Sequence, residues 1–198
     1  MRRRKAWHIP CLGPFQYVAR PDCEPFRDER RPSNLHSMQL RLSKIIVTAL
    51  SSVFLLVVVF NNLTDPNSNY QFVRHVLSMD TTFPGNTLMY RSIRAPILHK
   101  AFYATIIGWE ALCCALIGIG TFNLWKARGA PAAEWKKAKG LASIGFTASM
   151  IQWYFAFMTI GGEWFLMWQS KIWNGQDPAF RLFTFMGISL LFLNQPDE

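Results

Sequence analysis

Long stretches without a charged side chain constrain this chain more than any other feature of its sequence. The twenty residues from Ile45 to Thr64 and the twenty-three from Gly140 to Gly162 carry no charge. From Ala101 to Trp125 the only charged residue is Glu110. About 20 residues at 1.5 Å per residue cross the ~30 Å hydrocarbon core of a bilayer. Each of these three windows therefore predicts a transmembrane helix.

A fourth window, Leu182 to Asn194, is shorter. It reaches spanning length if its helix begins at Pro178, because proline is favoured at the first helical position and the Arg181 side chain can extend toward the interface. We therefore predict an all-α membrane protein with four transmembrane helices, forming one domain over residues 38–198. The expected spans cover about residues 44–64, 100–125, 140–162 and 178–195.

The overall composition excludes the usual soluble classes. Only 17% of the residues are charged, compared with about 25% in soluble globular proteins. A chain that is 51% hydrophobic and 15% aromatic would also not remain solvated as a disordered polymer. The lipid bilayer is thus the first partner that the sequence predicts.

The distribution of basic residues predicts the orientation of the spans. Residues 1–44 hold ten Lys and Arg against four acidic residues, and the 126–139 connection holds five against one. The positive-inside rule then places the N-terminus and the 126–139 connection in the cytoplasm, and four spans return the C-terminus to the same side. This N-in/C-in topology accounts for most of the net charge of +9, so we expect no nucleic-acid partner.

Residues 1–37 form a basic tail that contains five prolines. Prolines scattered among charges predict disorder, and no apolar run follows the charged start as it would in a signal peptide. An alternative is that translation starts at Met38, which stands directly before the first span.

The two outer connections are expected to hold short amphipathic helices. After the first span, Asp65 and Pro66 form a favourable helix start, and apolar residues from Phe72 to Met79 recur at helical spacing. The second connection, residues 163–173, is also amphipathic and strongly aromatic. Both segments are typical of helices that lie in the membrane interface.

Two segments carry a resemblance to a known family. The first is Gly-Gly-Glu-Trp-Phe-x-Met-Trp-Gln-Ser at 161–170, with Trp-Asn-Gly-Gln at 173–176, and the second is Asn-Tyr-Gln-Phe-Val-x-His-Val-Leu-Ser-Met-Asp-Thr at 69–81. Over about residues 40–196 the chain resembles the bacterial predicted small integral membrane proteins of domain-of-unknown-function family 2165. The resemblance implies a four-helix protein of the bacterial cytoplasmic (inner) membrane and a start near Met38. It assigns no activity, cofactor or catalytic residue.

Glu110 is the most informative single residue. It lies about 15 Å into the second span at 1.5 Å per residue, where a charge costs about 2.5–3.5 kcal/mol, so we expect it to be protonated or paired. If the second and third spans form a hairpin, Gln152 and Tyr154 fall at the same depth and complete a candidate intramembrane polar site. Such a site could relay protons or ions, or recognise a polar group. The alternative is a hydrogen-bonded clamp between helices.

A second group of polar residues belongs to the outer connections. These residues could line a shallow site, with histidine titrating near neutral pH, or they could be solvated interfacial charges. The candidate cluster consists of Arg74, His75, Asp80, His99, Glu163 and Asp177. The sequence contains no nucleophile elbow, phosphate loop or dinucleotide fingerprint. We therefore predict no catalytic, cofactor-binding or metal-binding residues.

Glycines in the second and third windows favour close helix packing, because they let two backbones approach. They are Gly118, Gly120, Gly140 and Gly145.

Three functions are compatible with these features. The first is a non-catalytic accessory, assembly or scaffold protein that works in a homo-oligomer or a larger membrane complex. The second is a small oligomeric transporter or channel that uses Glu110. The third is a membrane enzyme at the outer face. Small size and the lack of cofactor ligands in the sequence favour the first.

Overall fold

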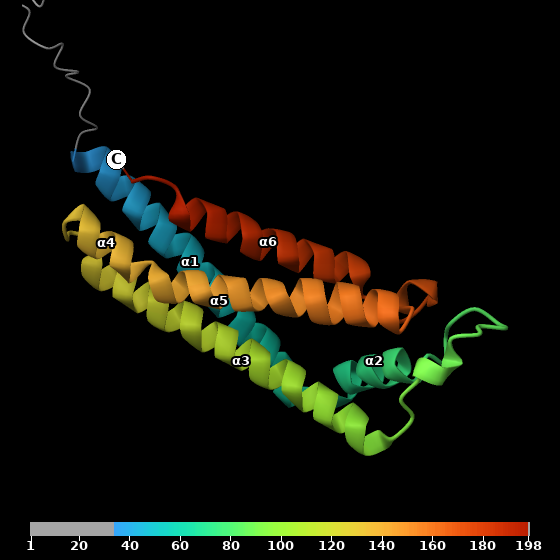
Figure 1. The fold of residues 1–198 in the computed structure, drawn as a ribbon. Coiled ribbons are helices and arrows are strands. Elements are labelled where there is room, and N and C mark those ends of the chain that lie inside the picture. Colours follow the sequence, from blue (N-terminus) through green and yellow to red (C-terminus); the bar gives the residue numbers. More distant parts are fainter. Residues whose placement is uncertain (1–33, 198) are drawn as a thin grey trace, which may run out of the picture. The chain divides into compact units, whose positions relative to one another are not determined.

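Residues 34–197 are described by the structure, a computed structural model of the 198-residue chain. Every regular element in that range is helical, and none is a strand. The helices are α1 (Asn34–Thr64), α2 (Pro66–Ser78), α3 (Pro96–Ala127), α4 (Ala132–Ala138), α5 (Gly140–Ile151), the π-helix η2 (Gln152–Trp164) and α6 (Gln176–Asn194), with the short 3-10 helices η1 (Met89–Arg91) and η3 (Met167–Gln169). The long helices α1, α3, α5 and α6 pack against one another as a bundle, and α2 lies at one end (Figure 1).

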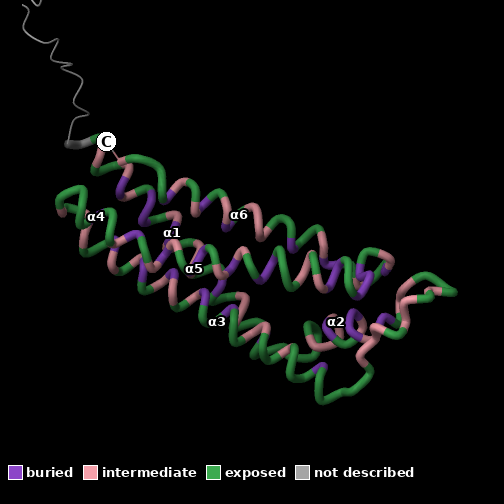
Figure 2. Tube along the Cα trace, in the orientation of Figure 1, coloured by how far each residue is buried: buried purple, intermediate pink, exposed green. Residues whose placement is uncertain are grey.

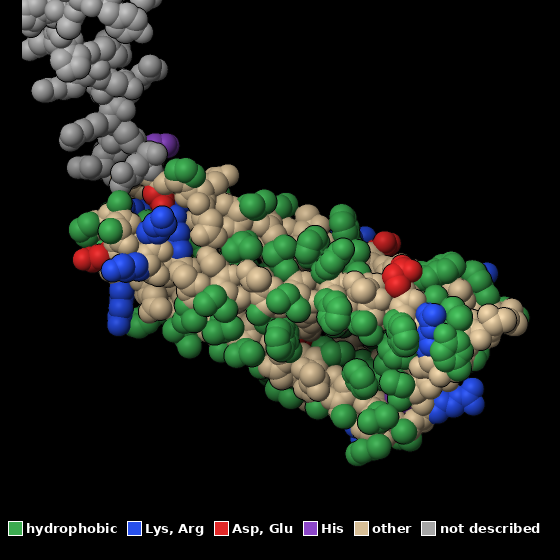
Figure 3. Space-filling model, in the orientation of Figure 1, with side chains coloured by type: hydrophobic (Ala, Val, Ile, Leu, Met, Phe, Trp, Pro, Cys, Tyr) green, Lys and Arg blue, Asp and Glu red, His purple; other side chains and the backbone are tan. Residues whose placement is uncertain are grey.

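Among residues 34–197, three helical segments are long and apolar enough to cross a membrane, namely His36–Thr64, Pro96–Ala127 and Ala132–Trp164. The third combines α4, α5 and η2. Helix α6 has 19 residues, or about 28 Å at 1.5 Å per residue, and its role as a fourth span stays a prediction. Hydrophobic side chains cover the visible face along the bundle, and charged side chains gather toward the two ends (Figure 3). This distribution suits a bundle surrounded by lipid.

Buried residues form two apolar cores. The larger lies between the long helices and includes Ile117, Trp135 and Phe146, each at most 1% exposed. The smaller joins α2 to the chain that follows η2, and it includes Leu77 and Met167. Figure 2 shows buried residues on the sides of the helices that face one another and exposed residues along their outer sides. The second core makes α2 an integral part of the bundle.

Helices α3 and α5 approach each other closely at two glycines. A Cβ atom added to Gly120 would lie 2.5 Å from the backbone nitrogen of Ala142, and one added to Gly145 would lie 3.0 Å from the backbone nitrogen of Ile117. Both positions are therefore sites of close packing, as the sequence suggested. The other two glycines do not bring α3 and α5 together: a Cβ atom added to Gly118 would lie 3.0 Å from the Ser52 hydroxyl of α1, and one added to Gly140 would have no such neighbour within 4 Å.

A buried ion-pair cluster closes the end of the bundle away from α2. The Lys44 ammonium donates to the Asp197 carboxylate at 2.6 Å, and Lys139 donates to the other oxygen of the same carboxylate. Burial raises the pKa of the Asp197 carboxyl, but the hydrogen bonds from Lys139 and Lys44 outweigh it, so the pKa lies below its ordinary value. The start of α1, the α4–α5 junction and the end of α6 thus meet at one end.

The second outer connection differs from its prediction. Residues 163–173 do not form one helix, because η2 ends at Trp164, Leu166 adopts a left-handed φ of 53°, and only the three residues of η3 are helical beyond it. A left-handed residue interrupts a right-handed helix. The turn that follows is held by the Ser170 hydroxyl oxygen, which accepts the backbone N–H of Trp173 at 2.9 Å.

The first connection contains the helix α2, and its place in the outer membrane interface stays a prediction. Helix α2 begins at Pro66, although the Asp65 carboxylate accepts the Ser68 hydroxyl at 2.6 Å instead of a backbone N–H. The predicted tail lies outside the described residues up to position 33, and the start at Met38 stays a prediction. Residues 34–37, which we assigned to the tail, belong to α1.

Candidate functional site

The Glu110 carboxylate lies in the interior of the bundle, where its residue is 2% exposed. Each of its two oxygens accepts one amide N–H. The Asn62 side chain of α1 donates to Oε2 at 2.8 Å, and the Gln152 side chain at the start of η2 donates to Oε1 at 3.1 Å. These two bonds join three helices through a single carboxylate. We call the group formed by Glu110, Asn62 and Gln152 the amide clamp.

The orientation of the Asn62 amide follows from its second partner. Its oxygen accepts the side-chain N–H of Asn69 in α2, so its nitrogen is free to donate to Glu110. The backbone carbonyl of Asn62 accepts the hydroxyl of Tyr103 at 2.8 Å. The clamp thus extends to α2, and every polar group on this path has a partner, as buried polar groups require.

The structure brings one of the two predicted partners to Glu110 and not the other. Gln152 reaches the carboxylate, whereas Tyr154 is 55% exposed and its ring packs against Phe183 at 5.3 Å between centroids. Residues two apart on a helix do not face the same side, so Gln152 and Tyr154 cannot both point at α3. Asn62 was not among the predicted partners. Its signal was a carboxamide near the end of an otherwise apolar window.

The predicted outer-face cluster is only partly assembled. Arg74, Asp80 and His99 line a hollow of about 550 Å³ between α2 and the chain before α3. His75 contacts the Asp80 carboxylate at 2.8 Å and stacks on Trp173 at 4.8 Å. The two remaining members, Glu163 and Asp177, are exposed and do not line this hollow.

His99 is a buried histidine with a backbone partner. It is 3% exposed, and its Nε2 lies 2.7 Å from the carbonyl oxygen of Ile93. Because a carbonyl oxygen can only accept, Nε2 carries the proton. This contact anchors the start of α3 to the preceding loop, which is a structural role.

Neither polar group places its side chains as a metal centre would. Among residues 34–197, no three His, Cys, Asp or Glu side chains are placed to hold a metal ion. The chemistry that the amide clamp can perform is hydrogen bonding between helices, since its carboxylate is enclosed and both oxygens are engaged.

The fold and the clamp define a small helical protein of the membrane. Its described helices include three candidate spans, and Glu110, Asn62 and Gln152 bond to one another in the bundle interior. The chain belongs to the family of predicted small integral membrane proteins, DUF2165, whose match covers residues 40–196. Searches of curated proteins and of solved structures found no match.

Proposed function

We propose that this protein is a non-catalytic accessory or scaffold component of a complex in the bacterial cytoplasmic membrane. The observation that supports this role is the amide clamp. A carboxylate that relays protons or ions must exchange its partners, whereas Glu110 is enclosed and holds one amide on each oxygen. The arrangement suits a fixed joint between α1, α3 and η2, and interhelical hydrogen bonds of this kind are a recognised means of helix association in membranes.

The proposed topology has four spans with both termini in the cytoplasm. Helix α6 is long enough to cross and packs along α5, η2 and α1. The ion-pair cluster of Lys44, Lys139 and Asp197 brings the start of α1 and the end of α6 to one end of the bundle, as an even number of crossings requires. The basic 126–139 connection lies at that end too, which the positive-inside rule assigns to the cytoplasm.

Exposed apolar side chains provide the surface for a partner. Phe54, Ile119 and Phe185 are 44%, 53% and 69% exposed on three different helices. Such faces meet lipid or the helices of other membrane proteins equally well, so a homo-oligomer or a larger complex both fit. The outer-face enzyme has weaker support, because Glu163 and Asp177 do not join His99 in one hollow.

A carboxylate swap tests the fixed role of the clamp. In Glu110→Gln, the new amide can accept from only one of the two donors, and the other faces an N–H₂ group. Leaving one buried donor unpaired costs about 1–3 kcal/mol. In the swap Glu110→Gln/Gln152→Glu, the amide introduced at position 110 accepts from Asn62 and donates to the carboxylate introduced at position 152, so the stability of the bundle should return. Glu134→Gln, at an exposed position of α4, is the matched control.

The readouts are thermal stability in nanodiscs and ion or proton flux in reconstituted vesicles. We expect lower stability in Glu110→Gln, recovery in the swap, and the same background flux in all variants. A flux in the wild type that Glu110→Gln abolishes and the swap does not restore would support the transporter and contradict our proposal. Native mass spectrometry of the protein purified in nanodiscs should also show a stoichiometric partner or a homo-oligomer, and only monomers would contradict the scaffold role.

A further inference from the structure

A groove opens in the side of the bundle where α3 and η2 move apart. Helices α3 and α5 are in close contact at Gly120 and Gly145. Toward α2, α3 diverges from η2, which continues α5, and α2 forms the third wall (Figure 1). The groove has a volume of about 400 Å³. Its walls include Val76 of α2, Ile106 of α3 and Ala156 of η2. The face in Figure 3 is hollowed between these elements.

The lining of the groove is almost entirely apolar, and its rims face outward. Phe102 and Trp109 on α3 are 41% and 37% exposed, and Phe155 on η2 is 56% exposed. An apolar cavity does not hold ordered water, because water needs several polar partners. In a bundle surrounded by lipid, hydrocarbon is the chemistry that fits this lining.

The size of the groove excludes a whole helix as its occupant. A helix with side chains is about 10–12 Å wide, so one 5.4 Å turn already fills about 400–600 Å³. The groove would therefore hold no more than a single turn of another helix. A volume of about 400 Å³ instead falls in the ~300–1,000 Å³ range of small-molecule sites. A single flexible chain can lie along it.

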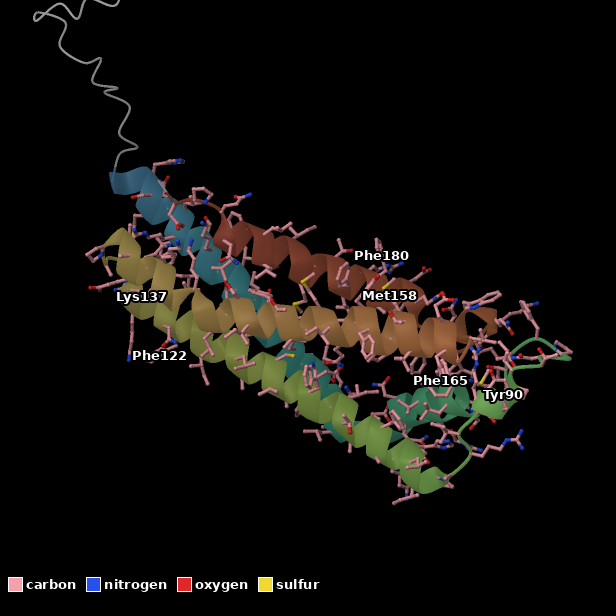
Figure 4. All side chains as sticks on the ribbon, in the orientation of Figure 1. Tyr90, Phe122, Lys137, Met158, Phe165 and Phe180 are labelled. Atoms are coloured by element: carbon pink, nitrogen blue, oxygen red, sulfur yellow. The ribbon has the colours of Figure 1, made fainter. Side chains whose placement is uncertain are left out.

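A cation contacts the residue next to one that lines the groove. The Arg91 guanidinium packs over the Trp164 ring at 4.6 Å and donates to the Trp164 carbonyl at 3.4 Å. Phe165, the next residue, lines the groove, and Figure 4 shows it beside α2 at the same end as Tyr90. No carboxylate among the described residues lies within ion-pair distance of Arg91.

We infer that this groove binds one acyl chain of an anionic phospholipid whose phosphate contacts Arg91. The apolar walls take the chain, and the Arg91 guanidinium, which has no carboxylate partner among the described residues, is complementary to a phosphate, which arginine binds through directed hydrogen bonds. The inference goes beyond the scaffold role and does not depend on it, because it concerns a lipid instead of a protein partner.

The test measures which lipid the full-length protein retains. The protein is reconstituted in nanodiscs of equal parts phosphatidylglycerol and phosphatidylcholine, released in mild detergent and examined by native mass spectrometry. We expect one retained phosphatidylglycerol, at least fivefold above phosphatidylcholine.

Ala156→Trp fills the groove and should reduce retention at least fivefold, whereas Ala111→Trp, on an exposed face of α3 outside the groove, should not. Arg91→Gln should remove the preference for phosphatidylglycerol, and Arg94→Gln should leave it unchanged.

A measurement on the wild type keeps the test valid if Ala156→Trp does not fold. In detergent, single-chain lysophosphatidylglycerol should raise the melting temperature more than lysophosphatidylcholine does, because a ligand of the native state stabilises it. Equal effects of the two lipids, or unchanged retention in a folded Ala156→Trp variant, would overturn the inference. A dimer of the wild type that Ala156→Trp dissociates would also overturn the inference, since a second copy of the chain would then occupy the groove. Gln152 of the amide clamp also lines the groove. The clamp is tested by the stability of Glu110→Gln and of the swap, whereas the groove is tested by lipid retention, so the two proposals can fail separately.

Discussion

The close contact between α3 and α5 gives the sharpest quantitative prediction for this fold. A Cβ atom at position 120 would lie 2.5–2.7 Å from the backbone nitrogen, Cα and Cβ of Ala142, compared with ordinary contacts of 3.4 Å or more. Gly120→Ala therefore requires a shift of about 0.7–0.9 Å between two backbones, which no side-chain rotation can absorb. Overpacking of this kind costs about 1–3 kcal/mol. Alanine regains about 0.5–1 kcal/mol over glycine within a helix.

The expected net effect of Gly120→Ala is thus a loss of about 1–2 kcal/mol of bundle stability. Gly108 lies on the same helix, and a Cβ atom added there would meet no atom of a neighbouring element within 4 Å. Gly108→Ala should therefore gain the helix propensity of alanine without a clash and stabilise the protein by about 0.5–1 kcal/mol. Two substitutions of the same chemistry on the same helix are thus expected to act in opposite directions.

Reversible unfolding in mixed micelles or bicelles measures this difference. The double variant Gly120→Ala/Ala142→Gly should recover only part of the loss, because the contact with the backbone nitrogen of residue 142 persists. If Gly120→Ala were as stable as Gly108→Ala, the two helices would not approach at this depth. The packing of α3 against α5 described above would then be wrong, and so would the register that places Glu110 beside Gln152.

Three further predictions concern other parts of the bundle. Asp197→Asn should destabilise the bundle because it leaves two buried ammonium groups without a carboxylate. Because folding lowers the pKa of the Asp197 carboxyl from 3.8, the ion pairs contribute fully to stability above pH 3.8, and this contribution is lost as the pH falls through the pKa of the folded state. An acid titration of thermal stability measures the loss. Tyr103→Phe removes the hydrogen bond to the Asn62 carbonyl and should lower the free energy of unfolding by about 0.5–1.5 kcal/mol. Tyr154→Phe, at an exposed position, should leave it almost unchanged, and equal losses in the two variants would contradict the bond between Tyr103 and Asn62. In a cysteine-free background, Thr87→Cys should react with an impermeant thiol reagent in intact cells and Lys137→Cys only after lysis, and the reverse pattern would contradict the proposed orientation.

The sequence was sufficient to predict those features that depend on one helix at a time. Uncharged windows predicted the three candidate spans, and the depth of Glu110 pointed to Gln152. Asn62 could not be predicted, because its contact depends on the rotation of α1 against α3, and an apolar helix carries little information about that angle. The bond from Asn62 to Asn69 likewise depends on where α2 folds back.

Tertiary packing also explains where the sequence misled. The aromatic run at 163–173 has helical periodicity, but Leu166 takes a left-handed conformation so that Met167 can reach the core around α2. The local sequence pattern of residues 163–173 favours a helix, but burial of Leu166 and Met167 with α2 interrupts it. The ion pair between Lys44 and Asp197 joins residues 153 apart, a separation over which periodicity says nothing.

The polar residues of this bundle are arranged as a means of fixing register. Between apolar helices in lipid there is no hydrophobic driving force, so helices with only apolar contacts can slide or rotate at little cost. The amide clamp fixes α1, α3 and η2 near the middle of the spans, and the cluster of Lys44, Lys139 and Asp197 fixes α1, the α4–α5 junction and the end of α6 at the end of the bundle away from α2. A carboxylate in the span costs about 2.5–3.5 kcal/mol on insertion, so its presence is better explained by specificity than by stability. A bundle held at mid-depth and at one end presents constant outer faces, which the proposed scaffold role requires.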